Sequence, residues 1–174
     1  MLSLILVLAA CGEDDASSGG AAATPEPTPT LTPTATPETG GTSAGAEQDT
    51  SVKPTIAKPS GEPPSRLVKK DLVRGEGRAA KSGDQVTVQY VGVSYSTGEQ
   101  FDASWDSGQP FPFELGAGAV IPGWDEGVPG MRVGGRRELT IPPDQAYGPQ
   151  GSPPAIGPNE TLIFVVDVVD IQPG

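Results

Sequence analysis

Leu162-Ile-Phe-Val-Val-Asp-Val-Val-Asp-Ile171 is a long, Val-rich apolar run bounded by Pro158 and Pro173. Its length and β-branched content predict a buried strand. Apolar and polar residues alternate with period 2 in three earlier stretches, and one stretch is a weaker strand candidate. The three are 85–90, 111–115 and 139–141, and the weaker one is 66–73. Thr97-Gly98 predicts a turn between strands, so residues 66–174 are predicted to be mostly antiparallel sheet.

One short helix is predicted in the middle of these strands. Pro122 suits the first helical position, and Pro129-Gly130 ends the pattern. Three apolar residues fall on one helical face: Ile121, Trp124 and Val128. A Pro- and Gly-rich loop follows from 142 to 160. The predicted class is α+β, with a curved antiparallel sheet wrapped on one short helix.

Residues 12–65 differ in composition from the rest of the chain. They consist largely of Gly, Ser, Ala, Thr, Pro and acidic residues, and all nine aromatic residues of the chain lie between Tyr90 and Phe164. Such a segment buries too little apolar surface to offset the entropy of ordering. We therefore expect a disordered tether over 12–65, followed by one domain over 66–174, an ordinary size for a domain.

The start of the chain resembles a bacterial lipoprotein signal. Residues 1–10 are almost all apolar, too few to span a bilayer but long enough for a signal-peptide core. They end in Leu8-Ala9-Ala10-Cys11, which resembles a lipobox. The expectation is a signal peptide over 1–11, lipidation of Cys11 and an extracytoplasmic protein anchored at the bacterial cell envelope. The alternative is a buried thiol closing a core helix, but the Gly, Ser and acidic residues that follow do not continue a helix.

Composition excludes several kinds of chemistry. The chain has no His and one Cys, so a His general base, a His metal site, an internal disulfide and a CxxC motif are absent. No glycine-rich phosphate loop or nucleophile elbow occurs. The formal net charge is −11 without a basic stripe, which disfavours nucleic acid as a partner. No metal and no cofactor is expected.

The aromatic residues lie in short, spaced motifs. These are Gly98-Glu-Gln-Phe101-Asp102, Pro110-Phe111-Pro-Phe113, Val120-Ile121-Pro-Gly123-Trp124, Leu139-Thr-Ile-Pro-Pro, Ala146-Tyr147-Gly148 and Leu162-Ile-Phe164. In this order and spacing they resemble FKBP-type peptidyl-prolyl cis-trans isomerases over residues 66–174. The resemblance implies about five strands around one helix. It also implies an apolar pocket between them that binds proline-containing polypeptides and rapamycin-like macrolides. The sequence does not determine the oligomeric state, and a monomer is the default expectation.

The resemblance also assigns the site residues. Asp102 would be the acidic group at the rim, the Ile121 backbone N–H would donate to a substrate carbonyl, and the Tyr147 hydroxyl would be a second donor. The remaining substrate-binding residues are apolar or aromatic: Tyr90, Phe101, Phe111, Val120, Trp124, Ile156 and Phe164. The alternative for any aromatic residue is a place in the core, which we expect for Phe113, Leu139 and Leu162.

Three residues depart from the pattern of the best-known family members. Ser107 stands where an Arg often pairs with the acidic group, Ser152 where a His is common, and Ala155 where a bulkier apolar residue is found. The function that the resemblance implies is proline isomerisation during folding of exported proteins. Two alternatives remain at this point: a module that binds proline segments with little catalysis, and a structural lipoprotein with no pocket.

Overall fold

The two longest strands, β2 (Gln85–Ser94) and β6 (Leu162–Gln172), pair side by side in the sheet. The computed structural model describes residues 49–174, so the predicted signal peptide, Cys11 and most of the tether lie outside the described residues. β2 and β6 pair antiparallel from Gln85↔Gln172 to Ser94↔Leu162. The apolar run that predicted a buried strand therefore pairs with β2 along its whole length and with β5 over 162–167.

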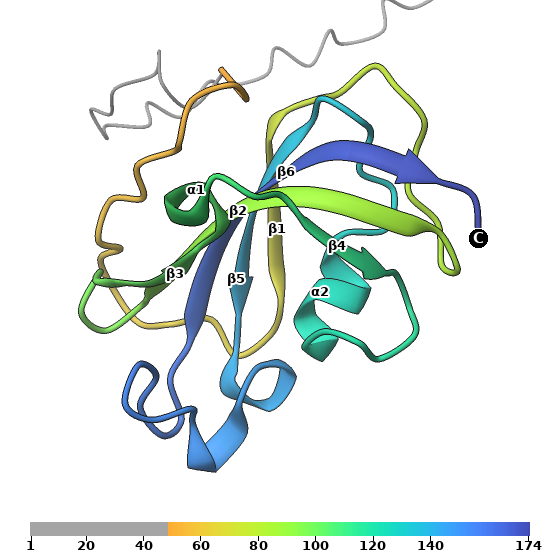
Figure 1. Ribbon diagram of the computed structural model, residues 1–174. Helices are drawn as coiled ribbons and strands as arrows, with labels where there is room; N and C mark the ends of the chain where they lie inside the picture. The colour runs from red at the N-terminus through yellow and green to blue at the C-terminus, as the bar shows by residue number, and fades with distance from the viewer. Residues whose placement is uncertain (1–48) are drawn as a thin grey trace, which may run out of the picture. The chain divides into compact units, whose positions relative to one another are not determined.

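The other strands extend the sheet on both sides of this pair. They are β1 (Val68–Val73), β3 (Gln100–Ala103), β4 (Phe111–Glu114) and β5 (Arg136–Ile141). The order is β1-β5-β6-β2-β3, with β4 also paired to β2, and all five strand pairings in residues 49–174 are antiparallel (Figure 1). This confirms the predicted curved α+β fold.

The sheet has six strands instead of about five because one edge is interrupted. β3 pairs with the second half of β2 and β4 pairs with its first half. Between them the chain forms a single turn, α1 (Ser104–Ser107), closed by Gly108 in the left-handed conformation. Sequence periodicity did not reveal β3 or α1, because each contains only four residues.

The predicted helix, α2 (Pro122–Gly127), is present and lies against β5. Two glycines allow the close approach. A Cβ on Gly123 would lie 2.4 Å from Ile141 Cγ2, and one on Gly127 would lie 2.8 Å from the Leu139 methyl groups. The loop after β5 contains two short 3₁₀ helices, η1 (Pro143–Gln145) and η2 (Gly148–Gln150).

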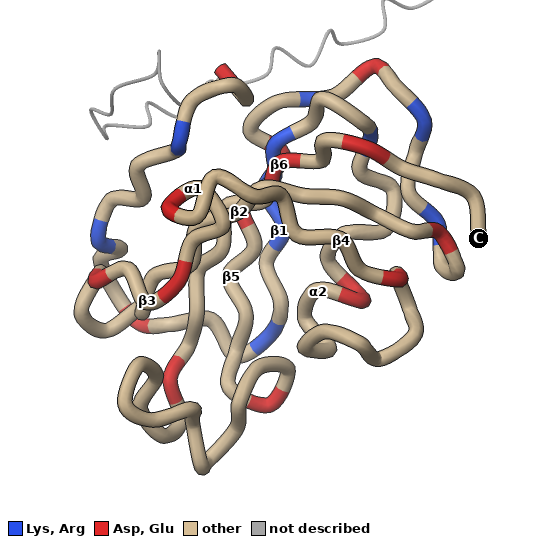
Figure 2. Tube along the Cα trace, in the orientation of Figure 1, with Lys and Arg blue, Asp and Glu red and all other residues tan. Residues whose placement is uncertain are grey.

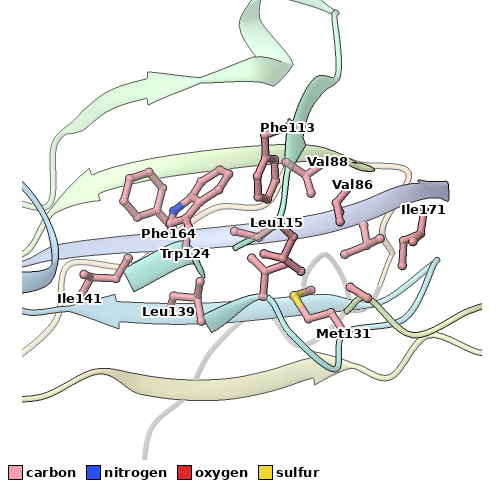
Figure 3. Close-up of a cluster of buried hydrophobic side chains, with 14 of the residues drawn as sticks. Val86, Val88, Phe113, Leu115, Trp124, Met131, Leu139, Ile141, Phe164 and Ile171 are labelled. Carbon is pink, nitrogen blue, oxygen red and sulfur yellow. The ribbon is translucent and has the colours of Figure 1, made fainter. Parts of the chain in front are cut away.

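The two faces of the sheet carry separate apolar clusters. The larger one lies between the sheet and α2, and Figure 3 shows Trp124 of α2 among Phe113, Leu139 and Phe164 of the strands. Leu162 belongs to it as well. The smaller cluster occupies the opposite face. Its buried members are Val91, Val93, Ala103 and Ile163, with Ile56, Tyr95 and Trp105 packed against them.

Residues 49–65 differ from the prediction that they belong to the disordered tether. They pass α1 and β3 before the chain enters β1 (Figure 1). Ile56 packs on the smaller cluster, Pro54 is buried, and Lys53 forms an ion pair with Asp106 of α1. We call residues 49–58 the strap. Its contacts use one isoleucine, one lysine and main-chain atoms, so composition alone did not distinguish it from the tether.

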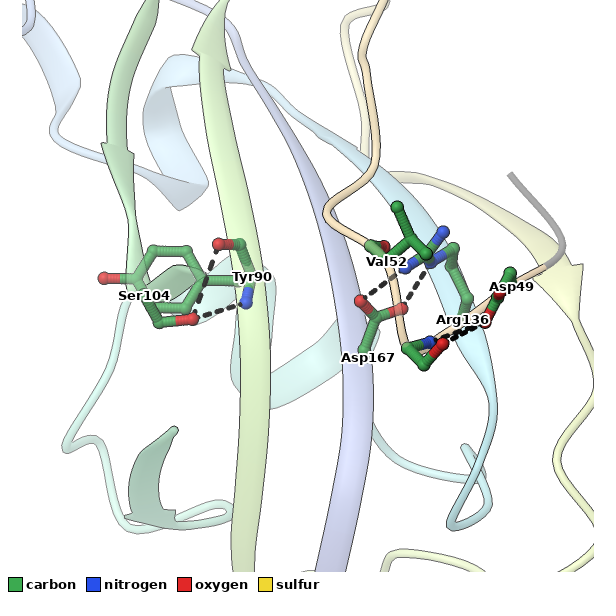
Figure 4. A network of polar contacts seen from close by, with 7 residues as sticks. Asp49, Val52, Tyr90, Ser104, Arg136 and Asp167 are labelled. Atoms are coloured by element: carbon green, nitrogen blue, oxygen red, sulfur yellow. Dashed lines mark hydrogen bonds and ion pairs between the residues drawn. The ribbon is translucent and has the colours of Figure 1, made fainter. Parts of the chain in front are cut away.

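The strap also covers a buried ion pair. Arg136 of β5 donates to both carboxylate oxygens of Asp167 in β6, at 2.5 and 2.8 Å, and its side chain is fully buried. The Val52 carbonyl accepts a further hydrogen bond from Arg136 Nη2 at 2.7 Å (Figure 4). Burial raises the pKa of Asp167, and the Arg136 guanidinium opposes that rise. Among residues 49–174 no helix is long and apolar enough to cross a bilayer.

Candidate active site

A cavity of about 500 Å³ opens between the inner face of the sheet, α2 and the loop after β5. Its lining is mainly aromatic and aliphatic, with one carboxylate. The lining residues are Tyr90, Phe101, Asp102, Phe111, Ala119, Val120, Ile121, Trp124, Tyr147 and Phe164. A hollow with a few polar groups among apolar walls is the usual form of a ligand site.

The aromatic walls come from different elements and pack edge to face. Trp124 of α2 lies under the ring of Tyr90 from β2, with centroids 5.2 Å apart, and beside Phe164 of β6 at 5.3 Å. Phe101 of β3 meets Phe164 at 5.5 Å. Edge-to-face pairs of this kind are favourable beyond their buried area, so the rings hold one another in place when the cavity is empty.

Tyr90 and Asp102 form the polar side of the cavity. The Tyr90 hydroxyl donates to Asp102 Oδ2 at 2.6 Å. Burial raises the pKa of Tyr90, and the hydrogen bond to the Asp102 carboxylate raises it further. Tyr90 is therefore a neutral donor throughout the physiological pH range, and Asp102 is fixed at the rim by it.

Three donors around the cavity have no hydrogen-bond partner among the described residues. The Ile121 N–H precedes the first turn of α2 and is not used by the helix. The Tyr147 hydroxyl belongs to a side chain that is 41% exposed. The indole nitrogen of Trp124 is buried at the floor without an acceptor. An unpaired buried donor is costly, so a bound group that offers carbonyl oxygens would be stabilised here.

The structure brings together nine of the ten residues predicted for the pocket. Ile156 is the exception, since it is 4% exposed in the larger core cluster and does not line the cavity. Ala119 lines the cavity and was not predicted, because nothing marks a single alanine in a loop. Gly92 was also missed. A Cβ there would lie 2.6 Å from Phe101 Cζ and 2.8 Å from Phe164 Cε1, so both rings require a glycine at this position.

Two of the three departures from the family pattern are now located. Ser107 closes α1 by donating to the Ser104 carbonyl at 2.8 Å and forms no hydrogen bond with Asp102. Asp102 accepts its hydrogen bond from the Tyr90 hydroxyl instead. Ser152 pairs with Ile156 through the main chain, at 2.9 and 3.0 Å. In residues 49–174 no three Asp, Glu or Cys side chains gather as they would around a metal ion.

Comparison with known proteins agrees with this geometry. The family model described as FKBP-type peptidyl-prolyl cis-trans isomerase matches residues 76–169. A Streptomyces anulatus protein named FK506-binding protein is 57% identical over 120 residues, which are 68% of this chain and 97% of that protein. A Corynebacterium glutamicum protein named probable FK506-binding protein is 51% identical over 117 residues, 67% of this chain and 97% of that protein.

A solved structure shares the fold. The crystal structure of FkpA from Escherichia coli has a TM-score of 0.56 and 42% sequence identity. The similarity covers 62% of this chain and 48% of the FkpA chain, so about half of FkpA has no counterpart in the comparison.

Proposed function

This chain belongs to the family of FKBP-type peptidyl-prolyl cis-trans isomerases, and on that premise we propose that it isomerises prolyl bonds in exported polypeptides at the bacterial cell envelope. The observation that carries the isomerase part is the aromatic cavity with its three unpartnered donors. The location rests on the lipobox-like Leu8-Ala9-Ala10-Cys11 alone.

The reaction requires no acid, base or nucleophile. Rotation about a prolyl bond breaks amide resonance, with a barrier of about 18–20 kcal/mol, and uncatalysed exchange takes tens to hundreds of seconds. The twisted amide is less dipolar than the planar one, so water stabilises the planar form more. A cavity walled by Phe101, Phe111 and Phe164 excludes that water and favours the twisted form relative to the ground state.

The donors add binding that increases during the rotation. A carbonyl of the peptide would accept from the Ile121 N–H at the start of α2, and the rotated carbonyl or its neighbour would accept from the Tyr147 hydroxyl. Hydrogen bonds that are stronger in the transition state than in the ground state raise the rate. The Tyr90–Asp102 pair supplies a polar edge against which the peptide is oriented.

The test follows a short X–Pro peptide by NMR exchange with the purified full-length chain. We expect acceleration that falls about two- to tenfold in Tyr147→Phe, the size of one lost neutral hydrogen bond. Tyr95→Phe is the matched control, because Tyr95 donates to the Glu62 carbonyl at 3.3 Å and lies outside the cavity. A folded protein that does not accelerate exchange contradicts the catalytic proposal.

The same experiment distinguishes the alternative function, a module that holds proline segments without isomerising them. Ser107 gives that alternative its support, since no guanidinium pairs with Asp102 here. Peptide binding without exchange would establish it. A rapamycin-like macrolide should compete with the peptide under either function, because both occupy the aromatic cavity. A structural lipoprotein without a ligand site would bind neither.

A further inference from the structure

A second hollow adjoins the aromatic cavity and shares Phe101 with it. It has a volume of about 410 Å³ and lies between the turn that joins β2 to β3 and the stem of the loop that enters β6. The turn contributes Ser96 and Glu99, and the stem contributes Ala155, Gly157 and Glu160. We call this hollow the side groove. A peptide whose proline fills the aromatic cavity reaches it by passing Phe101.

The side groove is open and held in place in the absence of a ligand. Glu160 accepts hydrogen bonds from the Ser96 N–H and hydroxyl, both at 2.9 Å, and so joins the two walls. Ala155 stands where the family pattern has a bulkier apolar residue. A Cβ added at Gly157 would meet nothing within 4 Å. These small residues leave space that a larger side chain at 155 would fill.

The elements that build the cavity and the side groove carry no positive charge. Residues 82–131 and 138–174 contain twelve acidic residues and no lysine or arginine. In Figure 2 the tube through β3, β4 and α2 carries red segments and no blue one. Of the four ion pairs among residues 49–174, none includes Asp102, Glu99 or Glu160. Lys58 of the strap is the cation beside this turn: a Cβ on Gly98 would lie 2.7 Å from Lys58 Cβ, and Lys58 lines an adjoining hollow with Ser96 and Glu160.

We propose that the side groove is a subsite for the polypeptide that flanks the proline, and that it selects lysine or arginine and disfavours acidic residues. This proposal rests on the proposed function, because the groove acts on a peptide already held in the cavity. The argument combines continuity through Phe101, the space left by Ala155 and Gly157, and two carboxylates, Glu99 and Glu160, that take part in none of the four ion pairs. Exposed charge pairs are each worth up to about fivefold in affinity.

The test compares X–Pro peptides that differ at one position. Lys, Gln or Glu is placed two residues before the proline in one set and two residues after it in another. Exchange rates and Kd are measured with the full-length chain at low and high salt. We expect kcat/KM to fall in the order Lys, Gln, Glu in one of the two sets, by about two- to fivefold a step. The order should flatten at 1 M salt, where the screening length is about 3 Å.

Variants assign the preference to the side groove. Glu99→Gln should weaken it and Glu99→Lys should reverse it. Ala155→Ile should reduce it by filling the space, with exchange of a short peptide that ends near the proline unchanged. Glu114→Gln is the charge-matched control. Glu114 pairs with Gln85, the first residue of β2, whereas the side groove lies beyond the last residue of β2, Ser94. At about 3.3 Å a residue the strand separates the two places by about 30 Å.

The outcomes separate the two proposals. If the chain does not accelerate exchange of the Gln peptides, the proposed function itself is contradicted. Exchange that is equal for Lys, Gln and Glu peptides in both sets overturns the side groove and leaves the isomerase intact. A preference that Glu114→Gln weakens as much as Glu99→Gln also overturns it, since the overall charge of −11 would then be the cause.

Discussion

Gly92 is the residue whose identity the cavity constrains most tightly, although it has no side chain of its own. It lies in β2 opposite Asp102, and Phe101 and Phe164 close over its α-carbon. Gly92→Ala would place a Cβ 2.6 and 2.8 Å from these rings, which must then move. We expect a loss of about 1–3 kcal/mol in the free energy of unfolding, measured by urea denaturation.

The displaced rings should also lower activity, because both wall the cavity. Gly157→Ala is the control for stability, since its Cβ would enter open space. If Gly92→Ala unfolds at the same urea concentration as the parent, the rings are looser than the geometry indicates. Sequence patterns identified the aromatic residues of the site, but the requirement for Gly92 depends on which rings meet across β2, β3 and β6.

Tyr90 gives a second prediction for a single residue. Tyr90→Phe removes the donor to Asp102 Oδ2 and keeps the ring that packs on Trp124. A hydrogen bond to a charged acceptor contributes about 1.5–3 kcal/mol, and this is the upper limit for the loss in the free energy of unfolding. The loss is smaller if water replaces the hydroxyl at the exposed rim. Peptide binding should weaken as Asp102 gains freedom. Unchanged stability and unchanged Kd would show that water supports Asp102 equally well.

Among the elements, β1 is joined to its neighbours by two charged side-chain contacts besides its main-chain pairing, and in one of them Lys69 donates to the Glu126 carbonyl of α2 at 3.3 Å. Arg137 of β5 forms an ion pair with Asp71 of β1, and it donates at 2.7 Å to the Gly127 carbonyl at the end of α2. The hydrogen bond from Arg137 lowers the pKa of Asp71 below its ordinary value of 3.8. Arg137 therefore connects two strands and the helix.

The lowered pKa predicts a pH-dependent role for Asp71. A carboxyl whose pKa is lower in the folded state stabilises the protein above its unfolded value, and that contribution is lost as pH falls through the folded value. Asp71→Asn should therefore reduce stability at pH 7 by up to about 1 kcal/mol, the range for exposed pairs. The difference should shrink below pH 3.8. Urea denaturation at pH 7 and pH 3 measures it, and an equal difference at both would contradict the pairing.

Sequence patterns predicted the strands and the helix whose residues show a clear pattern over enough positions. The three period-2 stretches correspond to β2, β4 and β5, the long apolar run to β6 and the weaker candidate to β1. The Pro122 signal corresponds to α2. β3 was missed because its alternation extends over only four residues, Gln100 to Ala103. α1 was missed because Ser104 is needed there for a contact distant in sequence: its hydroxyl accepts from the Tyr90 N–H at 2.8 Å.

At the scale of the whole molecule, the domain begins earlier than composition indicates. The described residues, 49–174, belong to one compact unit. The strap is Pro-containing and mostly polar, like the tether before it, and it docks by the Val52 carbonyl, Lys53 and Ile56. Local sequence does not encode such docking, because it depends on Arg136 and the outer cluster presented by distant strands.

The strap predicts that a chain trimmed after residue 58 will be less stable than one that keeps the strap. Removing residues 1–58 leaves Arg136 Nη2 without the Val52 carbonyl and uncovers the cluster around Val91 and Ile163. A lost hydrogen bond to a charged group costs about 1.5–3 kcal/mol, and exposing the apolar surface under Ile56 adds about 1 kcal/mol. We expect residues 59–174 to melt well below residues 49–174 in calorimetry. The aromatic cavity lies on the other face, so at low temperature both pieces should isomerise equally, and equal melting temperatures would show that the strap is dispensable.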